Sequence, residues 1–117
     1  MIYRLTTPED WQRAQQQGHF ASPDLAAEGF IHCSEYAQIL RTANKYFASA
    51  VSLRLLEIDD AQLGATLVRE DLSGGGTFPH VYAPITLSAV QAVHTLSRNA
   101  DRVWCLPTAL QTFGRTE

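Results

Sequence analysis

Alternating apolar and polar residues at the start of the chain predict a short β-strand over residues 2–6. A helix over residues 8–17 is expected to follow it. Thr7 is a suitable N-cap for this helix, and Pro8 suits the first helical position because its backbone angle is already helical. Gly18 can adopt the left-handed conformation that ends many helices, so we expect the helix to stop there.

A second helix is expected over residues 35–49, directly after a short strand over residues 29–34. Ser34 stands at the junction, where its hydroxyl can cap the helix. Apolar residues recur in this segment at helical spacing, which predicts one buried face; they are Tyr36, Ile39, Leu40, Ala43, Phe47 and Ala50. The preceding stretch, residues 22–28, contains a proline that disfavours ladder pairing, and we expect an irregular connection there.

The second half of the chain is patterned mainly as strands. We expect strands over residues 53–58, 65–70, 78–82, 90–96 and 102–105, with the first of these in the centre of a sheet. The last two are predicted to form a hairpin that turns at residues 99–101. The glycine-rich residues 73–77 are expected to form a flexible loop. With two main helices in the first half and strands in the second, the predicted fold class is α+β.

Composition supports a single folded domain over residues 1–117. Hydrophobic residues make up 45% of the chain and charged residues 18%, which is typical of a globular protein and not of a disordered one. Apolar runs are only a few residues long, so no membrane-spanning helix is expected. Cys33 and Cys105 lie far apart and form no CxxC motif. We therefore expect free thiols and a cytoplasmic location.

The charge pattern narrows the class of partner. The formal net charge is −3, and Lys45 is the single lysine beside eight scattered arginines. Because no basic block is present, strong nucleic-acid binding is not expected. Scattered arginines can still hold the phosphates of a small ligand, since the guanidinium group pairs well with phosphate oxygens. The composition thus favours a small nucleotide-type ligand over a long nucleic acid.

Two of the four histidines stand in contexts that suggest a site. His32 lies one residue before a predicted strand-to-helix junction, where helix N–H groups favour anions. The alternative is a structural histidine bonded to a nearby carbonyl group. His80 follows Pro79, whose ring restricts the local backbone, and a run of three glycines. Those glycines either let a ligand approach the backbone or form a long hairpin loop.

Four short motifs carry a resemblance to a known family. They are Ile-Tyr-Arg-Leu-Thr at residues 2–6, Gly-Phe-Ile-His-Cys-Ser at 29–34, Leu-Leu-Glu-Ile-Asp at 55–59 and Phe-Pro-His-Val-Tyr at 78–82. In this order and spacing they resemble the bacterial family called domain of unknown function 952, across roughly residues 1 to 96. That family is in turn similar in fold to the ADP-ribosyltransferases, especially the RNA 2′-phosphotransferase branch. The resemblance implies a split β-sheet of the ADP-ribosyltransferase type.

The resemblance also implies roles for particular residues in a site for NAD as cofactor. Arg4 takes the position of the group that holds a ribose hydroxyl of NAD, and the phosphotransferase branch has a histidine there. His32 takes the position that contacts the nicotinamide side. His80 and Glu57 are the other catalytic candidates, from their own sequence context and not from the resemblance; Glu57 points either inward, to stabilise a developing cation, or outward into solvent. Thr6, Ser34 and Tyr82, which lie in the same motifs, are the further candidates for binding the cofactor.

Three functions remain open on the sequence. The first is an ADP-ribosyltransferase-like enzyme or NAD glycohydrolase with a pocket for NAD or ADP-ribose. The second is a non-catalytic module of the same fold that binds a nucleotide or a protein. The third is a two-histidine cyclic phosphoesterase, for which His32-Cys33-Ser34 fits one motif and His80-Val81-Tyr82 does not fit the other. No cysteine or histidine pair has the spacing of zinc ligands, so no metal site is expected.

Overall fold

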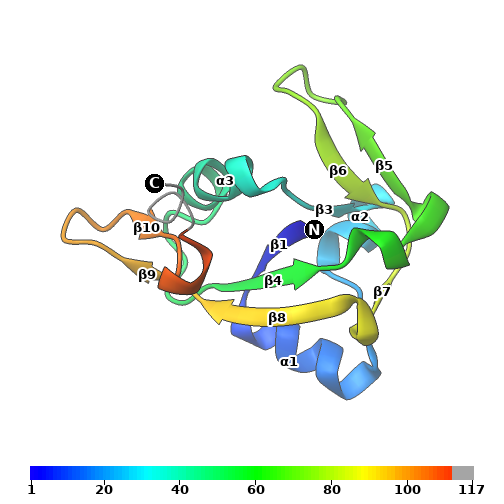
Figure 1. Ribbon diagram of the computed structural model, residues 1–117, viewed down its shortest axis with the longest axis horizontal. Helices are drawn as coiled ribbons and strands as arrows, with labels where there is room; N and C mark the ends of the chain where they lie inside the picture. Colours follow the sequence, from blue (N-terminus) through cyan, green and yellow to red (C-terminus); the bar gives the residue numbers. More distant parts are fainter. Residues whose placement is uncertain (112–117) are drawn as a thin grey trace.

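The computed structural model describes residues 1–111 and has the predicted α+β class, with two three-stranded sheets (Figure 1). The first sheet contains β1 (Ile2–Thr6), β4 (Arg54–Ile58) and β8 (Val90–Thr95), in the order β1-β4-β8. Both pairings are antiparallel, so the prediction of a central strand at 53–58 is confirmed. This strand is central because its side chains are apolar on both faces of the sheet.

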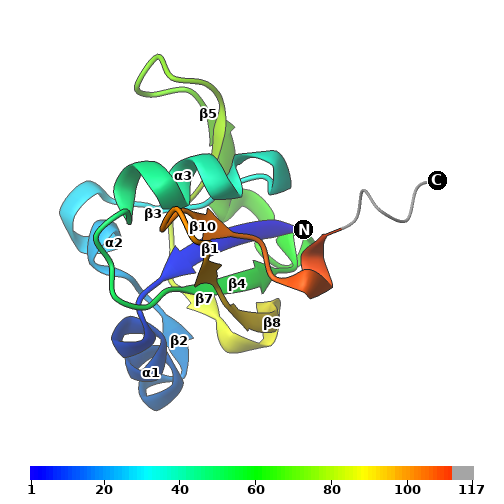
Figure 2. The same ribbon diagram turned by 90° about the vertical axis from the view of Figure 1, so that its left-hand side faces the viewer.

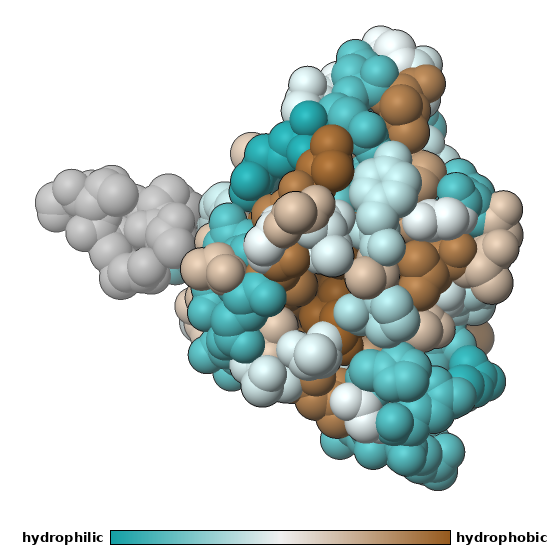
Figure 3. Space-filling view, turned by 90° about the vertical axis from the view of Figure 1, so that its right-hand side faces the viewer, coloured by the Kyte–Doolittle hydropathy of each residue, from teal (hydrophilic) through white to brown (hydrophobic). Residues whose placement is uncertain are grey.

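The second sheet contains β3 (Ile31–His32), β6 (Phe78–Val81) and β5 (Leu67–Glu70), in the order β3-β6-β5. Strands β5 and β6 form a hairpin that projects from the body of the molecule (Figure 1). Figure 3 shows hydrophobic residues in the middle of the side that carries this hairpin. Val68 and Leu72 are two exposed hydrophobic side chains of the β5–β6 hairpin.

The glycine-rich segment forms the tip of the β5–β6 hairpin, as one of the two sequence interpretations expected. Gly74 and Gly76 have φ angles of 82° and 121°, which side chains with a Cβ rarely adopt. The carboxylate of Asp71 accepts hydrogen bonds from the N–H groups of both glycines, at 2.7 and 3.3 Å. These amides are therefore already used within the loop.

Two shorter pairs of strands complete the chain. Strand β2 (His19–Phe20) pairs with β7 (Ile85–Thr86), and β9 (Ser97–Arg98) pairs with β10 (Trp104–Cys105). The predicted hairpin was expected to pair residues 90–96 with residues 102–105. Its first strand is wrong, since β9 is the partner of β10. The turn at 99–101 is present, but β9 forms the hairpin because β8 bonds to β4 instead.

Helix α1 (Pro8–Gln17) confirms the predicted helix at both ends. The side chain of Thr7 accepts a hydrogen bond from the N–H of Asp10 at 3.2 Å, which satisfies one of the free donors of the first turn. Gly18 ends the helix with a φ of 88°, and its N–H donates to the carbonyl of Ala14. Local sequence therefore determines this element.

Helix α2 (Pro23–Glu28) occupies the stretch for which an irregular connection was expected, so that prediction is wrong. Pro23 lies at the start of this helix, where its missing N–H costs nothing. Gly29 ends it with a φ of 90°. The proline that argued against a strand was thus the signal for a helix start.

Helix α3 (Ile39–Tyr46) is shorter than the predicted helix over 35–49, because its first turn is a 3-10 helix, Tyr36–Gln38. A capping box between Glu35 and Gln38 sets this start, in place of the predicted cap at Ser34. Four other short 3-10 helices occur in the described chain; they are Asp60–Gln62, Gly64–Thr66, Leu87–Ala89 and Thr108–Leu110.

Two apolar clusters form the core on the opposite faces of the first sheet. One contains Ile2, Leu56 and Ile58 together with residues of α1 and of the second sheet. The other contains Tyr3, Leu5, Leu53, Leu55, Ile39, Ala43 and Trp104. Figure 2 shows the same arrangement, with α3 on one side of β1 and α1 on the other. This alternation along β1 and β4 fixes which side chains of the first sheet face the second.

Candidate functional site

The two sheets join at one point and then separate, which creates the space for a pocket. Tyr3 and Ser34 form an isolated antiparallel bridge, with N–H to O distances of 2.9 and 2.7 Å. Continued antiparallel pairing would place His32 beside the next part of β1. Instead, two side chains bind the backbone of His32. Asp24 accepts from its N–H at 2.8 Å, and Arg4 donates to its carbonyl at 2.8 Å.

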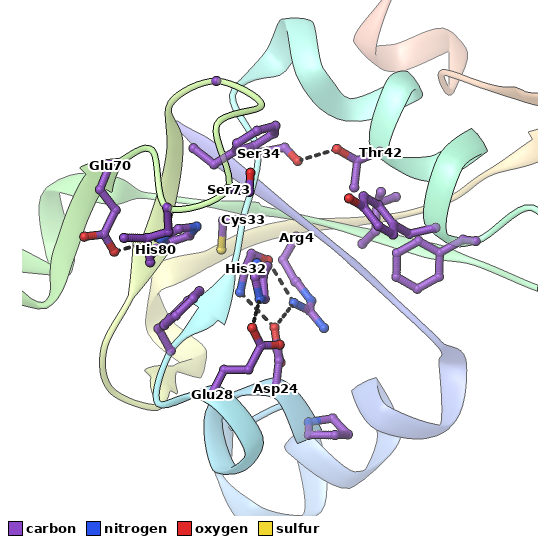
Figure 4. A pocket seen from close by; sticks show the side chains of 18 of the residues that line it. Arg4, Asp24, Glu28, His32, Cys33, Ser34, Thr42, Glu70, Ser73 and His80 are labelled. Atoms are coloured by element: carbon purple, nitrogen blue, oxygen red, sulfur yellow. Dashed lines mark hydrogen bonds and ion pairs between the residues drawn. The ribbon is translucent and has the colours of Figure 1, made fainter.

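A pocket of about 800 Å³ lies in this gap, within the range typical of small-molecule sites. Residues of β1, α2, β3, α3 and the β5–β6 hairpin line it (Figure 4). Four of the seven predicted site residues lie among them: Arg4, His32, Ser34 and His80. The structure therefore brings together residues that are up to 76 positions apart in the sequence, counting from Arg4 to His80.

His32 and His80 lie directly opposite each other across β3 and β6. The backbone groups of His32 face away from β6, since Cys33 makes the neighbouring bond to Pro79. This pair is thus of the non-hydrogen-bonded kind, in which the side chains approach closely. The two ring centroids are 5.3 Å apart, and the ring of Phe30 lies 4.2 Å from His80 and 4.7 Å from His32.

Glu70 orients His80, and the sequence analysis missed it. Its carboxylate is 2.7 Å from Nδ1 of His80 and also accepts a hydrogen bond from the hydroxyl of Tyr82. The hydrogen bond from Tyr82, followed by the one from His80, holds the pKa of Glu70 below its usual range. With Nδ1 bound to Glu70, the other ring nitrogen of His80 is the one that can face a ligand. The sequence did contain a signal for Glu70. Side chains alternate along β5, and in a hairpin with β6 this puts Val68 and Glu70 on the same face of the sheet as His80.

Arg4 and Asp24 form a largely enclosed ion pair, with Nη1 2.6 Å from Oδ2. Burial raises the pKa of Asp24, but the charge of Arg4 and hydrogen bonds from His32, Ser22 and Arg4 together hold it below the usual value. Among the described residues, the buried Nε of Arg4 has no hydrogen-bond partner. The sequence analysis missed Asp24, because it expected no helix at residues 22–28.

His32 is more exposed than His80 and has a carboxylate neighbour of its own. Its Nε2 lies 3.1 Å from the carboxylate of Glu28, on α2, which also lines the pocket. Asp24, Glu28 and Glu70 thus surround the two histidines with negative charge (Figure 4). This part of the pocket suits a neutral or cationic group better than a phosphate.

Cys33 and Ser34 also line the pocket, but neither is an activated nucleophile. Burial raises the pKa of the Cys33 thiol to about 12, so the thiol is uncharged at neutral pH. The hydroxyl of Ser34 lies 3.4 Å from that of Thr42 on α3. Neither histidine ring is among the hydrogen-bond partners of Ser34 within residues 1–111. The two residues therefore shape the wall between β3 and α3.

Three predicted site residues lie outside the pocket. Glu57 points to the opposite face of the first sheet from Arg4, where its carboxylate contacts Nε2 of His94. Thr6 is buried at the end of β1. Tyr82 is 44% exposed just beyond β6, and it reaches the site only through Glu70 and its ring contact with Phe30. The alternation of side chains along β4 puts Glu57 on the same face as Leu55, but it does not say whether that face carries the pocket.

Two further features concern metals and membranes. Within residues 1–111, no group of three or more histidine, cysteine or carboxylate side chains is arranged to hold a metal ion. Cys33 and Cys105 are both free thiols. Over the same residues, each helix is too short or too polar to cross a bilayer.

Comparison with known proteins identifies relatives for nearly the whole chain. The crystal structure of protein CC0527 from Caulobacter crescentus is 37% identical, with a TM-score of 0.84, and the match covers 93% of this chain and 96% of that one. The solution NMR structure of CC0527 is 38% identical, with a TM-score of 0.77, and the match covers 87% and 89% of the two chains. No protein with a curated description matches the chain.

A family model described as "Protein of unknown function (DUF952)" matches residues 5–93. This range includes His32, Ser34 and His80, while Arg4 lies one residue before it. The motifs that suggested the resemblance therefore fall almost entirely within the matched segment. Because the match spans well over half of the sequence, this chain belongs to the DUF952 family.

Proposed function

We propose that the pocket between the two sheets binds a nucleotide of the NAD or ADP-ribose type. One observation carries this proposal: Arg4, His32 and His80 come from three separate motifs and line a single pocket of about 800 Å³. The volume suits a ligand of this size class. Arg4, the residue to which the resemblance assigns the ribose, lines this pocket together with the two histidines.

The resemblance to ADP-ribosyltransferases gives the proposal its chemistry. Two antiparallel sheets that meet at Tyr3 and Ser34 and then separate are consistent with the split sheet of that fold. In the proposed reaction the bond between nicotinamide and ribose breaks, and nicotinamide leaves with the bonding electron pair. Water or another acceptor then bonds to the ribose carbon and loses a proton. We assign the acceptance of that proton to His80, which Glu70 orients.

The pocket's carboxylates match the charge that this reaction develops. The transition state is cationic at the ribose, and oriented negative groups stabilise such a charge. Glu57 was the carboxylate expected from the sequence, but it faces away from the pocket. Glu28 and Glu70 line the pocket and stand beside the two histidines. We therefore assign the electrostatic role to these two side chains.

A non-catalytic binding module is the second candidate, and a specific observation favours it. Each polar side chain at the centre of the site already has an internal partner: Arg4 has Asp24, His32 has Glu28 and His80 has Glu70. Paired groups of this kind hold a rigid pocket but are less available for chemistry. On this alternative, the protein binds the nucleotide and releases it unchanged.

Titration with NAD and with ADP-ribose tests the proposal directly. Amide signals of residues 30–34 and 78–82 are expected to shift on addition of either ligand, and His32→Ala is expected to weaken the binding. His94→Ala makes the same change at a histidine that lines neither this pocket nor the smaller one beside it, and it serves as the control. If neither ligand moves these signals at millimolar concentration, the proposal is wrong.

Two product assays distinguish the candidate functions. Release of nicotinamide from NAD by the wild type, lost in His80→Gln, identifies an enzyme of the transferase or glycohydrolase type. Binding without release identifies the module. Turnover of a 2′,3′-cyclic nucleotide that depends on both His32 and His80 identifies the third candidate, the two-histidine phosphoesterase.

A further inference from the structure

A second, smaller groove adjoins the main pocket beside α3 and the glycine-rich hairpin tip. Its lining residues are Arg41, Thr42, Lys45, Tyr46, Ser73, Gly75 and Phe78. Four of these, Thr42, Tyr46, Ser73 and Phe78, line the main pocket as well. The two spaces therefore share a wall and adjoin each other. We call this smaller space the basic groove.

Arg41 and Lys45 give the basic groove its charge. They are four residues apart on α3 and so project from the same side of the helix. Two like charges at this spacing destabilise a helix slightly, and within residues 1–111 no carboxylate lies within ion-pair distance of either one. In contrast, Arg4, Arg13 and Arg69 each contact an aspartate or glutamate.

The contacts that these two cations make leave their charge uncompensated. The Nη2 of Arg41 donates to the carbonyl of Gly75 at 3.0 Å, and its guanidinium lies 5.8 Å from the ring centre of Phe78. The ammonium group of Lys45 lies 5.1 Å from the ring of Tyr46. These neutral partners position the side chains at the groove. The guanidinium of Arg41 retains further N–H donors, and Lys45 has three.

The two ends of the combined space thus differ in charge. Asp24, Glu28 and Glu70 surround the histidines at one end and would repel a phosphate. Thr42, which borders the basic groove, lies across the pocket from Asp24 and Glu28 (Figure 4). A ligand with a neutral or cationic ring at one end and phosphates further along matches this arrangement in one orientation only.

We infer that the basic groove binds the phosphates of the ligand, through Arg41 and Lys45. This inference rests on the proposed function for the identity of the ligand, but it adds a subsite on α3 and an orientation. The terminal ribose, with any ring that it carries, lies beside His32 and His80, and the diphosphate runs along α3 towards the hairpin tip. The amides of Gly74 and Gly76 are already bonded to Asp71, so side chains and not the loop backbone supply the donors.

Charge-neutral variants and three probes test the subsite. The variants are Arg41→Gln, Lys45→Gln and the double variant, since glutamine keeps the length and the helix preference of the position. Arg102→Asn is the matched control, because it removes one positive charge from the exposed turn between β9 and β10, where asparagine tolerates the positive φ of 63°. The probes are ADP-ribose, nicotinamide riboside (which has no phosphate) and inorganic pyrophosphate.

The expected result is selective. The double variant should bind ADP-ribose about tenfold more weakly, as expected for the loss of about 1.4 kcal/mol, and should bind nicotinamide riboside as the wild type does. Pyrophosphate alone should shift the amide signals of Arg41 and Lys45, with a strong dependence on salt because both side chains are exposed. Arg102→Asn should leave all three results unchanged.

Other outcomes separate this inference from the proposed function. If ADP-ribose shifts the His32 and His80 signals but the double variant binds it with unchanged affinity, the phosphate subsite is wrong and the proposed function stands. If pyrophosphate shifts Arg41 and Lys45 while ADP-ribose and the riboside leave His32 and His80 unaffected, the anion site stands and the nucleotide proposal fails. Equal loss of affinity in Arg102→Asn would overturn the subsite, since only the net charge would then matter.

Discussion

Two histidine–glutamate pairs lie in different parts of this molecule and invite comparison. His80 and Glu70 stand on neighbouring strands of the second sheet, with Nδ1 2.7 Å from the carboxylate. His94 and Glu57 stand on β8 and β4 of the first sheet, where Nε2 contacts the carboxylate. In each pair, both side chains are largely enclosed by protein. The chemistry of the two pairs is therefore nearly the same.

Their surroundings differ. The ring of His80 stacks on Phe30, faces His32 and lines the pocket. Glu57 lies beside Tyr3 on the face of the first sheet that packs against α3, and neither it nor His94 lines the main pocket or the basic groove. A histidine–carboxylate pair is thus a candidate for function only where other groups converge on it.

The largest expected effect concerns the ion pair that keeps the two sheets apart on the pocket side. Arg4→Ala should lower the free energy of unfolding by about 3 kcal/mol, because it leaves the enclosed carboxylate of Asp24 without its cation. Urea unfolding measures this loss. The double variant Arg4→Ala/Asp24→Ala should lose less than the sum of the two single variants. A loss near zero for Arg4→Ala would show that the pair is solvated.

The second prediction compares the two histidines directly. His80→Gln should weaken binding of ADP-ribose about tenfold, equal to about 1.4 kcal/mol, because the ring that stacks on Phe30 and lines the pocket is lost. His94→Gln makes the same chemical change outside the pocket and should leave the affinity unaltered. Isothermal titration calorimetry on both variants gives the comparison. Equal affinities in the two variants would contradict the difference drawn between the pairs.

Local signals in the sequence predicted a large part of the fold. The cap at Thr7 and the stop at Gly18 set the ends of α1, and alternation set the range of β1. Two short motifs also placed His32 and His80 in strands, although the pairing of these strands was not predicted. These features depend on a few neighbouring residues, which is why one sequence suffices to predict them.

Features that depend on distant contacts were not predictable in the same way. Glu57 shares its strand parity with Leu55, and the sequence does not say which face of β4 carries the pocket. Asp24 and Glu70 gain their roles only from Arg4 and His80, which lie at least ten positions away. The pairing of β8 with β4 likewise depends on a separation of more than thirty residues.

The third prediction concerns how the stability that Asp24 provides, on the pocket side of the first sheet, depends on pH. The pKa of Asp24 lies below its ordinary value of 3.8, so the native state binds this proton less readily than the unfolded state. Its contribution to stability is therefore present above about pH 4 and is lost as the pH falls through the folded-state pKa. Asp24→Asn should cost about 1–2 kcal/mol at neutral pH, with the difference shrinking in acid. Urea unfolding across this pH range measures it, and a constant difference would contradict the assignment.

The smallest expected effect concerns Glu57, which lines neither the main pocket nor the basic groove. Burial raises the pKa of Tyr3, and the negative charge of Glu57 raises it further. Glu57→Gln removes that second cause, so the pKa of Tyr3 should fall towards its ordinary value while the free energy of unfolding drops by only about 0.5–1 kcal/mol. NMR of isotope-labelled tyrosine rings follows the titration, with Tyr3→Phe assigning the signal. Affinity for ADP-ribose should stay unchanged in the same variant, because Glu57 faces away from Arg4. If the affinity falls, the two faces of the sheet are coupled, and Glu57 is again a candidate for the catalytic role that its sequence context suggested.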